Sequence, residues 1–146
     1  MTNLQPECLI CARQKNSTIP IFESDHWVIR HSIETNILGY VLIEAKRHFL
    51  DLSEATDTEA ESYGPLLKRV CGALRTLLPA QRVYTITLAE VVPHFHVHVI
   101  PRTNQVPKSF RGRGILGYPL VPAADEALVT EFGKRLAKSL AISCRV

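Results

Sequence analysis

The chain has 146 residues, of which 46% are hydrophobic and 21% charged, and its formal net charge is +3. This length suits one domain with its own core, and the composition is that of an ordinary globular protein. The small charge gives no indication of a nucleic-acid partner, no apolar run approaches the roughly 18 residues of a membrane span, and the first residues lack the features of a signal peptide, so we expect a cytoplasmic protein without a membrane partner.

The N-terminal part contains the motif Cys8-Leu9-Ile10-Cys11. Four cysteines in a chain without secretory features indicate free thiols rather than a disulfide framework. The C-x-x-C spacing of Cys8 and Cys11 suits metal binding, although so short a motif also fits two reduced thiols on a loose terminus.

Three strands are predicted in the first third of the chain. Residues 19–24 and 26–30 are rich in β-forming residues and are separated by a polar turn, which indicates a hairpin. Residues 40–44 indicate a third strand, which ends in the basic cluster 46–48.

Residues 52–78 predict a long helix. Thr56 and Glu59 fit a capping box, and leucine and valine recur after them at helical spacing. Gly64 and Pro65 interrupt the pattern, because an interior proline lacks the backbone donor and clashes with the preceding turn. We therefore expect a kink or a break at this point.

The last third of the chain is predicted to be a loop followed by a helix. Glycine and proline are frequent in residues 103–122, which indicates a loop or an extended arm. Arg111 and Arg113 could clamp a phosphate there, but a solvated loop is favoured because surface loops are commonly charged. Residues 125–140 predict an amphipathic helix. Its apolar stripe consists of Leu128, Phe132, Leu136 and Leu140.

A strand predicted at 82–88 leads into the segment 92–102, which contains three alternate histidines. Because side chains alternate along a strand, one face is expected to present His94, His96 and His98, while the other packs in the core through Phe95, Val97 and Val99. Alternate positions lie about 7 Å apart, so the row suits contacts along a polyphosphate better than one metal bound by all three histidines. A merely polar strand face and a histidine-rich metal site are the alternatives.

The segment His94-Phe95-His96-Val97-His98-Val99-Ile100 resembles the histidine-triad pattern of the HIT family, and Pro101-Arg102 after it is similar to many members. The resemblance extends from about Cys8 to Arg102. It implies an α+β fold with an antiparallel sheet of about five strands, one long helix and a C-terminal helix. The expected organisation is a single domain over residues 1–146, with a core at about 8–102 and a C-terminal loop and helix at 103–146.

The resemblance also implies an activity. In the family the middle histidine attacks the α-phosphorus of a nucleotide and water then hydrolyses the nucleotidyl-histidine, so His96 is the expected nucleophile. His98 is expected to contact the phosphate or to protonate the leaving group. The implied substrates are purine nucleotide conjugates, either dinucleoside polyphosphates or nucleoside phosphoramidates, and a triad that ends in histidine favours hydrolysis over phosphorylase-type transfer.

A structural zinc site is implied by the same resemblance. Some bacterial HIT proteins complete a C-x-x-C pair with the histidine after the third strand and the first histidine of the triad, which gives a closed tetrahedral Zn²⁺ site. The matching residues here are Cys8, Cys11, His48 and His94.

The nucleoside pocket and the assembly are implied less specifically. The family forms this pocket from the strand and loop before the third strand, and from the residues there we select Ile29 and Asn36 as nucleotide-binding, together with His96 and His98. The other candidates by position are Phe22, Val28, Arg30, Ser32 and Leu38. HIT proteins commonly form homodimers through the long helix and a sheet edge, and the apolar stripe from Leu66 to Leu78 is expected to leave room for a second copy.

Two departures from the family pattern keep other functions open. Val91 stands where many members have a serine or threonine that contacts phosphate, and Leu88-Ala89 belongs to a segment that lacks the common Gly-Gln. The alternative is therefore a zinc-stabilised nucleotide-binding module with little turnover that acts through partners. A weaker alternative is a redox or metal-handling protein that uses Cys8 and Cys11.

Overall fold

A single antiparallel sheet is the centre of the fold in a computed structural model that describes residues 7–16 and 19–143. The strand order is β1-β2-β3-β5-β4, and each neighbouring pair is antiparallel. The strands are β1 (Phe22–Glu23), β2 (Trp27–His31), β3 (Val41–Ala45), β4 (Arg82–Ile86) and β5 (His96–Arg102). The predicted α+β fold with about five antiparallel strands is confirmed.

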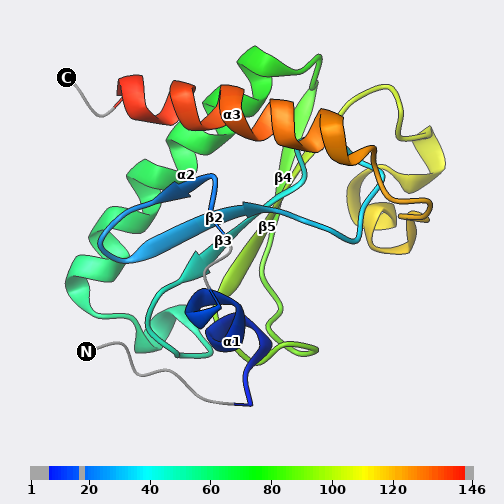
Figure 1. The fold of residues 1–146 in the computed structure, drawn as a ribbon. Helices are drawn as coiled ribbons and strands as arrows, with labels where there is room; N and C mark the ends of the chain where they lie inside the picture. The colour runs from blue at the N-terminus through cyan, green and yellow to red at the C-terminus, as the bar shows by residue number, and fades with distance from the viewer. Residues whose placement is uncertain (1–6, 17–18, 144–146) are drawn as a thin grey trace.

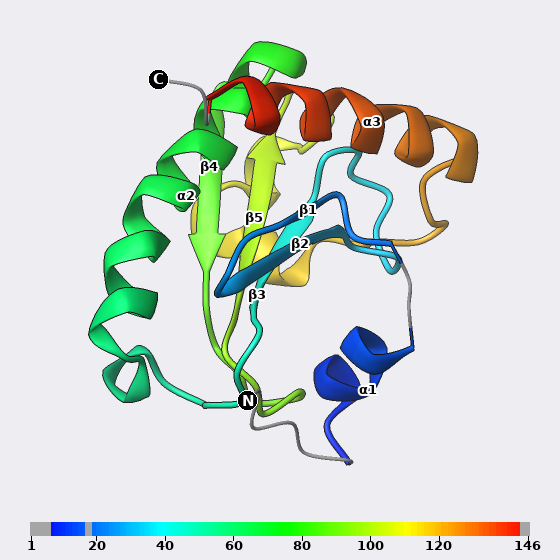
Figure 2. The same cartoon turned by 60° about the vertical axis from the view of Figure 1, so that its left-hand side comes forward.

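Helices cover the two faces of the sheet unequally (Figures 1 and 2). The long helix α2 (Asp57–Leu77) and the C-terminal helix α3 (Glu126–Ser143) pack together over one face. The short helix α1 (Leu9–Lys15) lies against the opposite face. None of the helices in the described part of the chain has the length and apolarity needed to cross a bilayer.

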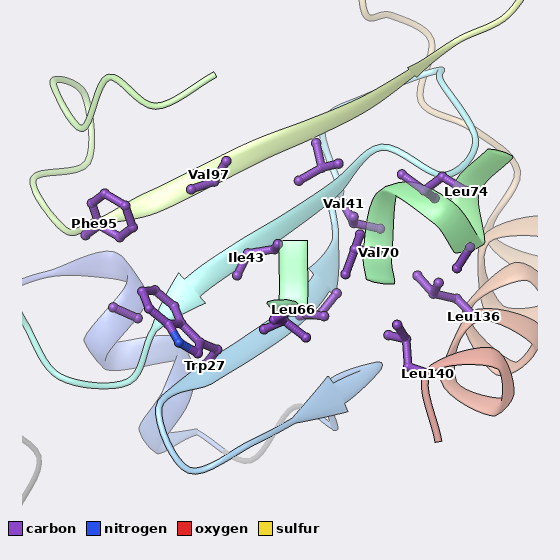
Figure 3. Packing of buried hydrophobic residues seen from close by; sticks show 14 of the residues in the cluster. Trp27, Val41, Ile43, Leu66, Val70, Leu74, Phe95, Val97, Leu136 and Leu140 are labelled. Atoms are coloured by element: carbon purple, nitrogen blue, oxygen red, sulfur yellow. The ribbon is translucent and has the colours of Figure 1, made fainter. Parts of the chain in front are cut away.

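The main core lies between the sheet and the two long helices (Figure 3). Alternate strand residues point into it, so Val97 and Val99 of β5 are 1% and 0% exposed, and Phe95 just before the strand is 2% exposed. These residues contact Leu66, Val70 and Leu74 of α2 and Phe132, Leu136 and Leu140 of α3 within the same cluster. The prediction that Phe95, Val97 and Val99 belong to the core is confirmed.

The predicted capping box starts α2. The Thr56 hydroxyl accepts from the backbone N–H of Glu59, and the Glu59 carboxylate accepts from the backbone N–H of Thr56 at 2.8 Å. The expectation at Gly64 and Pro65 was a kink or a break, and the helix continues through both residues without a break. Burial of the residues that follow, with Leu66 at 4% exposure, outweighs the one hydrogen bond that proline removes.

The apolar stripes of the two long helices are only partly buried. In the stripe from Leu66 to Leu78, Val70 and Leu74 are fully buried in the protein's own core, whereas Leu67, Leu77 and Leu78 are only partly buried, so room for a second copy on this helix stays a prediction. In α3, Leu128 is 58% exposed, although it was expected to lie on the buried stripe of that helix.

The segment predicted as a loop at 103–122 is a packed structure on the histidine face of the sheet. It contains two short 3₁₀ helices, η2 (Lys108–Phe110) and η3 (Gly112–Gly117). Its residues Val106 and Ile115 are 0% and 7% exposed and form a second core cluster with Ile37, Tyr40 and Ile100. The Nε of Arg111 donates to the Val106 carbonyl at 3.1 Å, so this arginine holds the segment together.

Candidate functional site

Two histidines of β5 form the centre of the candidate site. His96 and His98 project from the same face of the strand, and their ring centroids are 4.9 Å apart. His94 precedes the first residue of β5, so the predicted row of three along one strand is wrong for this residue. Its ring is instead buried, at 0% exposure, in a cluster with two cysteines and His48.

The tautomer of His96 follows from its hydrogen bond. Nδ1 of His96 lies 2.7 Å from the backbone carbonyl oxygen of His94. A carbonyl only accepts, so Nδ1 carries the proton and donates it. In the neutral ring this arrangement leaves the lone pair on Nε2, which is the requirement for a nucleophile.

His98 is paired with a tyrosine. The hydroxyl of Tyr40, the residue just before β3, lies 2.8 Å from Nδ1 of His98. Burial lowers the pKa of His98 to about 4, with a further contribution from His96, and burial raises the pKa of Tyr40 to about 12. Both side chains are therefore neutral near pH 7.

Four side chains at one end of the sheet meet in a compact cluster. Nδ1 of His94 lies 3.4 Å from Sγ of Cys8, 3.5 Å from Sγ of Cys11 and 3.2 Å from Nδ1 of His48. All four ligand atoms lie within 4.8 Å of one another. Tetrahedral zinc with bonds of about 2.3 Å to sulfur and about 2.0 Å to nitrogen spaces its ligands roughly 3.3–3.8 Å apart, so the donor set fits this metal.

A backbone carbonyl orients His94 for this cluster. Nε2 of His94 lies 2.7 Å from the carbonyl oxygen of Ala45, which makes Nε2 the protonated nitrogen and leaves the lone pair of Nδ1 for a metal. Burial lowers the pKa of His94 to about 4, so the ring is neutral, as a ligand must be.

A buried carboxylate connects β3 to α1 and β2. Glu44 lies opposite His96 in the β3–β5 register and is 0% exposed. It forms ion pairs with Arg13 of α1 and with Arg30 of β2, whose Nε is 3.5 Å away. A buried carboxylate requires such partners, so Glu44 ties the cysteine-bearing helix to the sheet.

Two hollows are candidates for ligand binding. The larger has a volume of about 630 Å³ and lies on the β2 side of the sheet, lined by Arg13 of α1, Arg30 of β2 and Lys134 of α3, and no histidine of the triad is among its lining residues. The smaller has a volume of about 170 Å³ and includes His98 in its lining.

The two residues selected for the nucleoside lie elsewhere. Ile29 is 0% exposed in the main core, on the sheet face opposite to His96, and this placement corrects its assignment as a nucleotide contact. The side-chain amide of Asn36 donates to the carbonyl of Pro119 at 3.1 Å, so it holds the segment after β5. A nucleotide contact of Asn36 stays a prediction.

Three residues of the site were missed by the sequence analysis: Tyr40, Glu44 and Arg13. Glu44 offered a signal, because an acidic residue in the apolar strand 41–45 needs a buried partner. Arg13 and Tyr40 offered none, because their roles depend on contacts with residues far away in the sequence.

Comparisons with solved structures show the same fold at low identity. A HIT-like protein involved in cell-cycle regulation from Bartonella henselae has 16% identity and a TM-score of 0.71, with 94% of this chain and 99% of that chain covered. A hypothetical histidine triad nucleotide-binding protein from Sulfolobus tokodaii has 17% identity and a TM-score of 0.70, with 92% of this chain and 91% of that chain covered. A zinc-bound histidine triad family protein from Mycobacterium smegmatis has 23% identity and a TM-score of 0.68, with 94% of this chain and 96% of that chain covered.

A search of curated proteins found no match. The family model described as the HIT domain, however, matches residues 13–105. This match spans more than half of the chain and includes all three triad histidines, His94, His96 and His98. On this evidence the chain belongs to the HIT family.

Proposed function

We propose that this protein is a nucleotidyl hydrolase or transferase that acts at the α-phosphate of a purine nucleotide conjugate through a covalent nucleotidyl-His96. The substrate class comprises dinucleoside polyphosphates and nucleoside phosphoramidates. The observation that carries the proposal is the hydrogen bond from Nδ1 of His96 to the His94 carbonyl, which leaves Nε2 unprotonated.

In the first step, Nε2 of His96 forms a bond to the α-phosphorus while the bond from phosphorus to the leaving group breaks. The leaving group takes the electron pair and a proton from solvent. The ring becomes positively charged, and the His94 carbonyl, 2.7 Å from Nδ1, stabilises this charge. In the second step, water bonds to phosphorus and gives up a proton, the N–P bond breaks, and a nucleoside monophosphate and neutral His96 result.

His98 acts as a fixed hydrogen-bond donor in this scheme. The scheme assigns the Tyr40 hydroxyl as the donor to Nδ1 of His98, 2.8 Å away, so that the proton of the neutral ring is on Nε2, where it can bind a phosphate oxygen. Because burial lowers the pKa of His98 to about 4, the ring holds no second proton near pH 7. Contact with the phosphate is therefore favoured over protonation of the leaving group.

The nucleoside is assigned to the larger hollow. Arg13 and Arg30 line it and also pair with Glu44, which lies opposite His96 in the register, and these contacts support the assignment although His96 itself does not line the hollow. Two guanidinium groups there complement the negative charge of a nucleotide.

Zinc is assigned to Cys8, Cys11, His48 and His94 as a structural ion. The distances of 3.2–3.5 Å from Nδ1 of His94 to the other three ligand atoms are close to those of a tetrahedral site, and the relative from Mycobacterium smegmatis is zinc-bound. Four protein ligands leave no open position for water, so the ion would stabilise the fold and hold the His94 carbonyl next to His96.

A homodimer is proposed through the β4 edge of the sheet. β4 pairs with β5 on one side only, so the backbone groups on its other side are open to a second strand. The half-buried apolar residues of α2, Leu67, Leu77 and Leu78, would contribute the helix part of the same interface.

The test is to incubate the protein with diadenosine polyphosphates and with adenosine phosphoramidate, with the His96→Ala variant in parallel. We expect the wild type to release AMP and to carry an adenylyl group on His96 when the reaction is quenched, and the variant to bind AMP without turnover. Turnover that survives in the variant would overturn the mechanism. Binding without turnover in the wild type would instead favour the zinc-stabilised binding module.

A further inference from the structure

The smaller hollow on the histidine face, beside His98, is almost entirely apolar. The sheet supplies its floor through Ile86 and Ile100, and the segment after β5 supplies its roof through Ile115 and Leu116. Among its polar lining groups, the Tyr40 hydroxyl is already hydrogen-bonded to Nδ1 of His98, at 2.8 Å. The hollow therefore suits an apolar group of a ligand better than a charged one.

We propose that this hollow binds an apolar, ring-sized portion of the leaving group, so that the substrates are nucleotide conjugates with an aryl or arylalkyl leaving group. This inference rests on the proposed function, because it takes His96 as the nucleophile and assigns the nucleoside to the larger hollow. A dinucleoside polyphosphate fits this substrate class less well, because its leaving group carries a second nucleoside with a polar base and ribose.

The register of the sheet supports this assignment. Arg30, Leu42, His98 and Ile86 are consecutive partners across β2, β3, β5 and β4, and they point to the same face. Neighbouring strands lie about 4.8 Å apart, so the backbone of Arg30 is roughly 10 Å from that of His98, and Ile86 lies about 5 Å beyond. A conjugate with its nucleoside at Arg30 and its phosphate at the histidines would place its leaving group at Ile86.

The size of the hollow supports a single ring. Its volume of about 170 Å³ is close to that of apolar protein cavities of about 150 Å³ that bind benzene. A purine nucleoside is considerably larger than benzene, and it fits the hollow of about 630 Å³ on the other side.

The roof of the hollow is specific to this chain's C-terminal segment. The HIT domain model ends at residue 105, whereas Ile115, Leu116, Tyr118 and Leu120 all follow it. Asn36 holds this segment in place through the Pro119 carbonyl. The floor of the hollow thus lies inside the part of the chain that the family model covers, and its roof lies outside it.

The experiment compares two substrates that differ only in the apolar group, the N-methyl and the N-(2-phenylethyl) phosphoramidates of AMP. Both release AMP and an alkylamine of similar basicity. We expect kcat/KM for the phenylethyl compound to exceed that for the methyl compound at least tenfold. Leu88→Ser and Leu116→Ser change lining residues that are 60% and 67% exposed, so they should fold normally and reduce this ratio several-fold.

Leu128→Ser is the matched control, because Leu128 is 58% exposed on α3 and lines neither hollow. It should keep the wild-type ratio. A ratio near one in the wild type, or a ratio that neither lining variant changes, would overturn the inference. Self-association that Leu116→Ser abolishes, together with a ratio near one, would assign the hollow to a second copy and would also overturn it.

A binding measurement distinguishes failure of the proposed function from failure of this inference. If neither compound is hydrolysed in a His96-dependent way, calorimetric titration of both into the His96→Ala protein tests the hollow alone. Tighter binding of the phenylethyl compound that Leu116→Ser removes would support the hollow as an apolar subsite. Equal affinities for the two compounds would reject it.

Discussion

At the scale of single residues, hydrogen bonds to neutral partners decide what each histidine can do. The carbonyls of His94 and Ala45 each accept from one ring nitrogen and free the other nitrogen of the same ring. For His96, which is 7% exposed, the freed atom is Nε2, whereas for His94 it is Nδ1, inside the cysteine cluster. One backbone segment thus frees a different ring nitrogen on each of the two histidines.

The Tyr40–His98 pair gives a prediction at this scale. Tyr40→Phe removes the hydroxyl 2.8 Å from Nδ1 of His98 and keeps the ring, so the tautomer of His98 is no longer held. We expect kcat to fall about tenfold with a smaller change in KM, since loss of a transition-state hydrogen bond of about 1.4 kcal/mol is a tenfold effect. Steady-state kinetics of the variant measure this, and an unchanged kcat would contradict the role given to Tyr40.

The family resemblance in the sequence predicted the three histidines and the grouping of His94 with Cys8, Cys11 and His48, but not the pairing of His98 with Tyr40. The i, i+2 spacing of His96 and His98 placed both on one face without knowledge of the rest of the fold. His94 has the same spacing, yet it lies outside β5, because the cluster and the Ala45 carbonyl hold its ring. The contact between Tyr40 and His98 could be recognised only once the structure had shown that β3 and β5 are neighbours.

At the scale of secondary-structure elements, the start of α2 is fixed by local contacts. The Thr56 hydroxyl caps the helix, and the Glu59 carboxylate accepts both from Thr56 and from Arg47, whose Nε is 2.9 Å away. The hydrogen bond from Arg47 is the largest contribution that holds the pKa of Glu59 below its ordinary value. The cap therefore fixes both the helix and the basic segment after β3.

Removal of this cap should destabilise the whole domain. Thr56→Ala leaves the backbone N–H of Glu59 without its side-chain acceptor, and we expect a loss of about 1 kcal/mol in the free energy of unfolding. Thr76→Ala is the matched control, because Thr76 is an exposed threonine near the other end of α2. Urea unfolding of both variants measures the difference, and equal midpoints would show that the cap contributes nothing.

Elements with local signals could be predicted, and elements held by distant contacts could not. The strands and α2 follow from alternation, helical spacing and a capping box. Helix α1 has seven residues and an N-cap formed by the Cys8 sulfur, which accepts from the Cys11 backbone at 3.5 Å, and the sequence analysis did not find it. The η2–η3 segment was predicted to be a solvated loop or arm, because nothing in its own sequence indicates that it packs. It is held in place by contacts with residues far away in the sequence, such as Tyr40 and Ile100.

At the scale of the whole molecule, the cysteine–histidine cluster joins segments that the sheet alone does not hold together. Cys8→Ser removes one ligand, so we expect metal content to fall from one zinc per chain to well below one. The melting temperature should drop by about 10 °C, as expected for the loss of roughly 3–5 kcal/mol in a domain of this size. Elemental analysis and thermal unfolding measure both effects.

The matched control for this prediction is Cys71→Ser, because Cys71 is a half-buried cysteine on α2 outside the cluster. It should retain one zinc per chain. A wild-type protein purified with far less than one zinc, and insensitive to a chelator, would reject the metal site.

The ligands that close the cluster are widely separated along the polypeptide, with 86 positions between Cys8 and His94. A nascent chain that leaves the ribosome therefore exposes its two thiols first, and His94 follows only after all of α2 has been synthesised. Until His48 emerges the thiols lack both histidines of the cluster, and from then until His94 emerges they lack one of them. The complete set of four side chains is therefore available only late in synthesis, and we expect a metal ion to be bound by all four only at that stage.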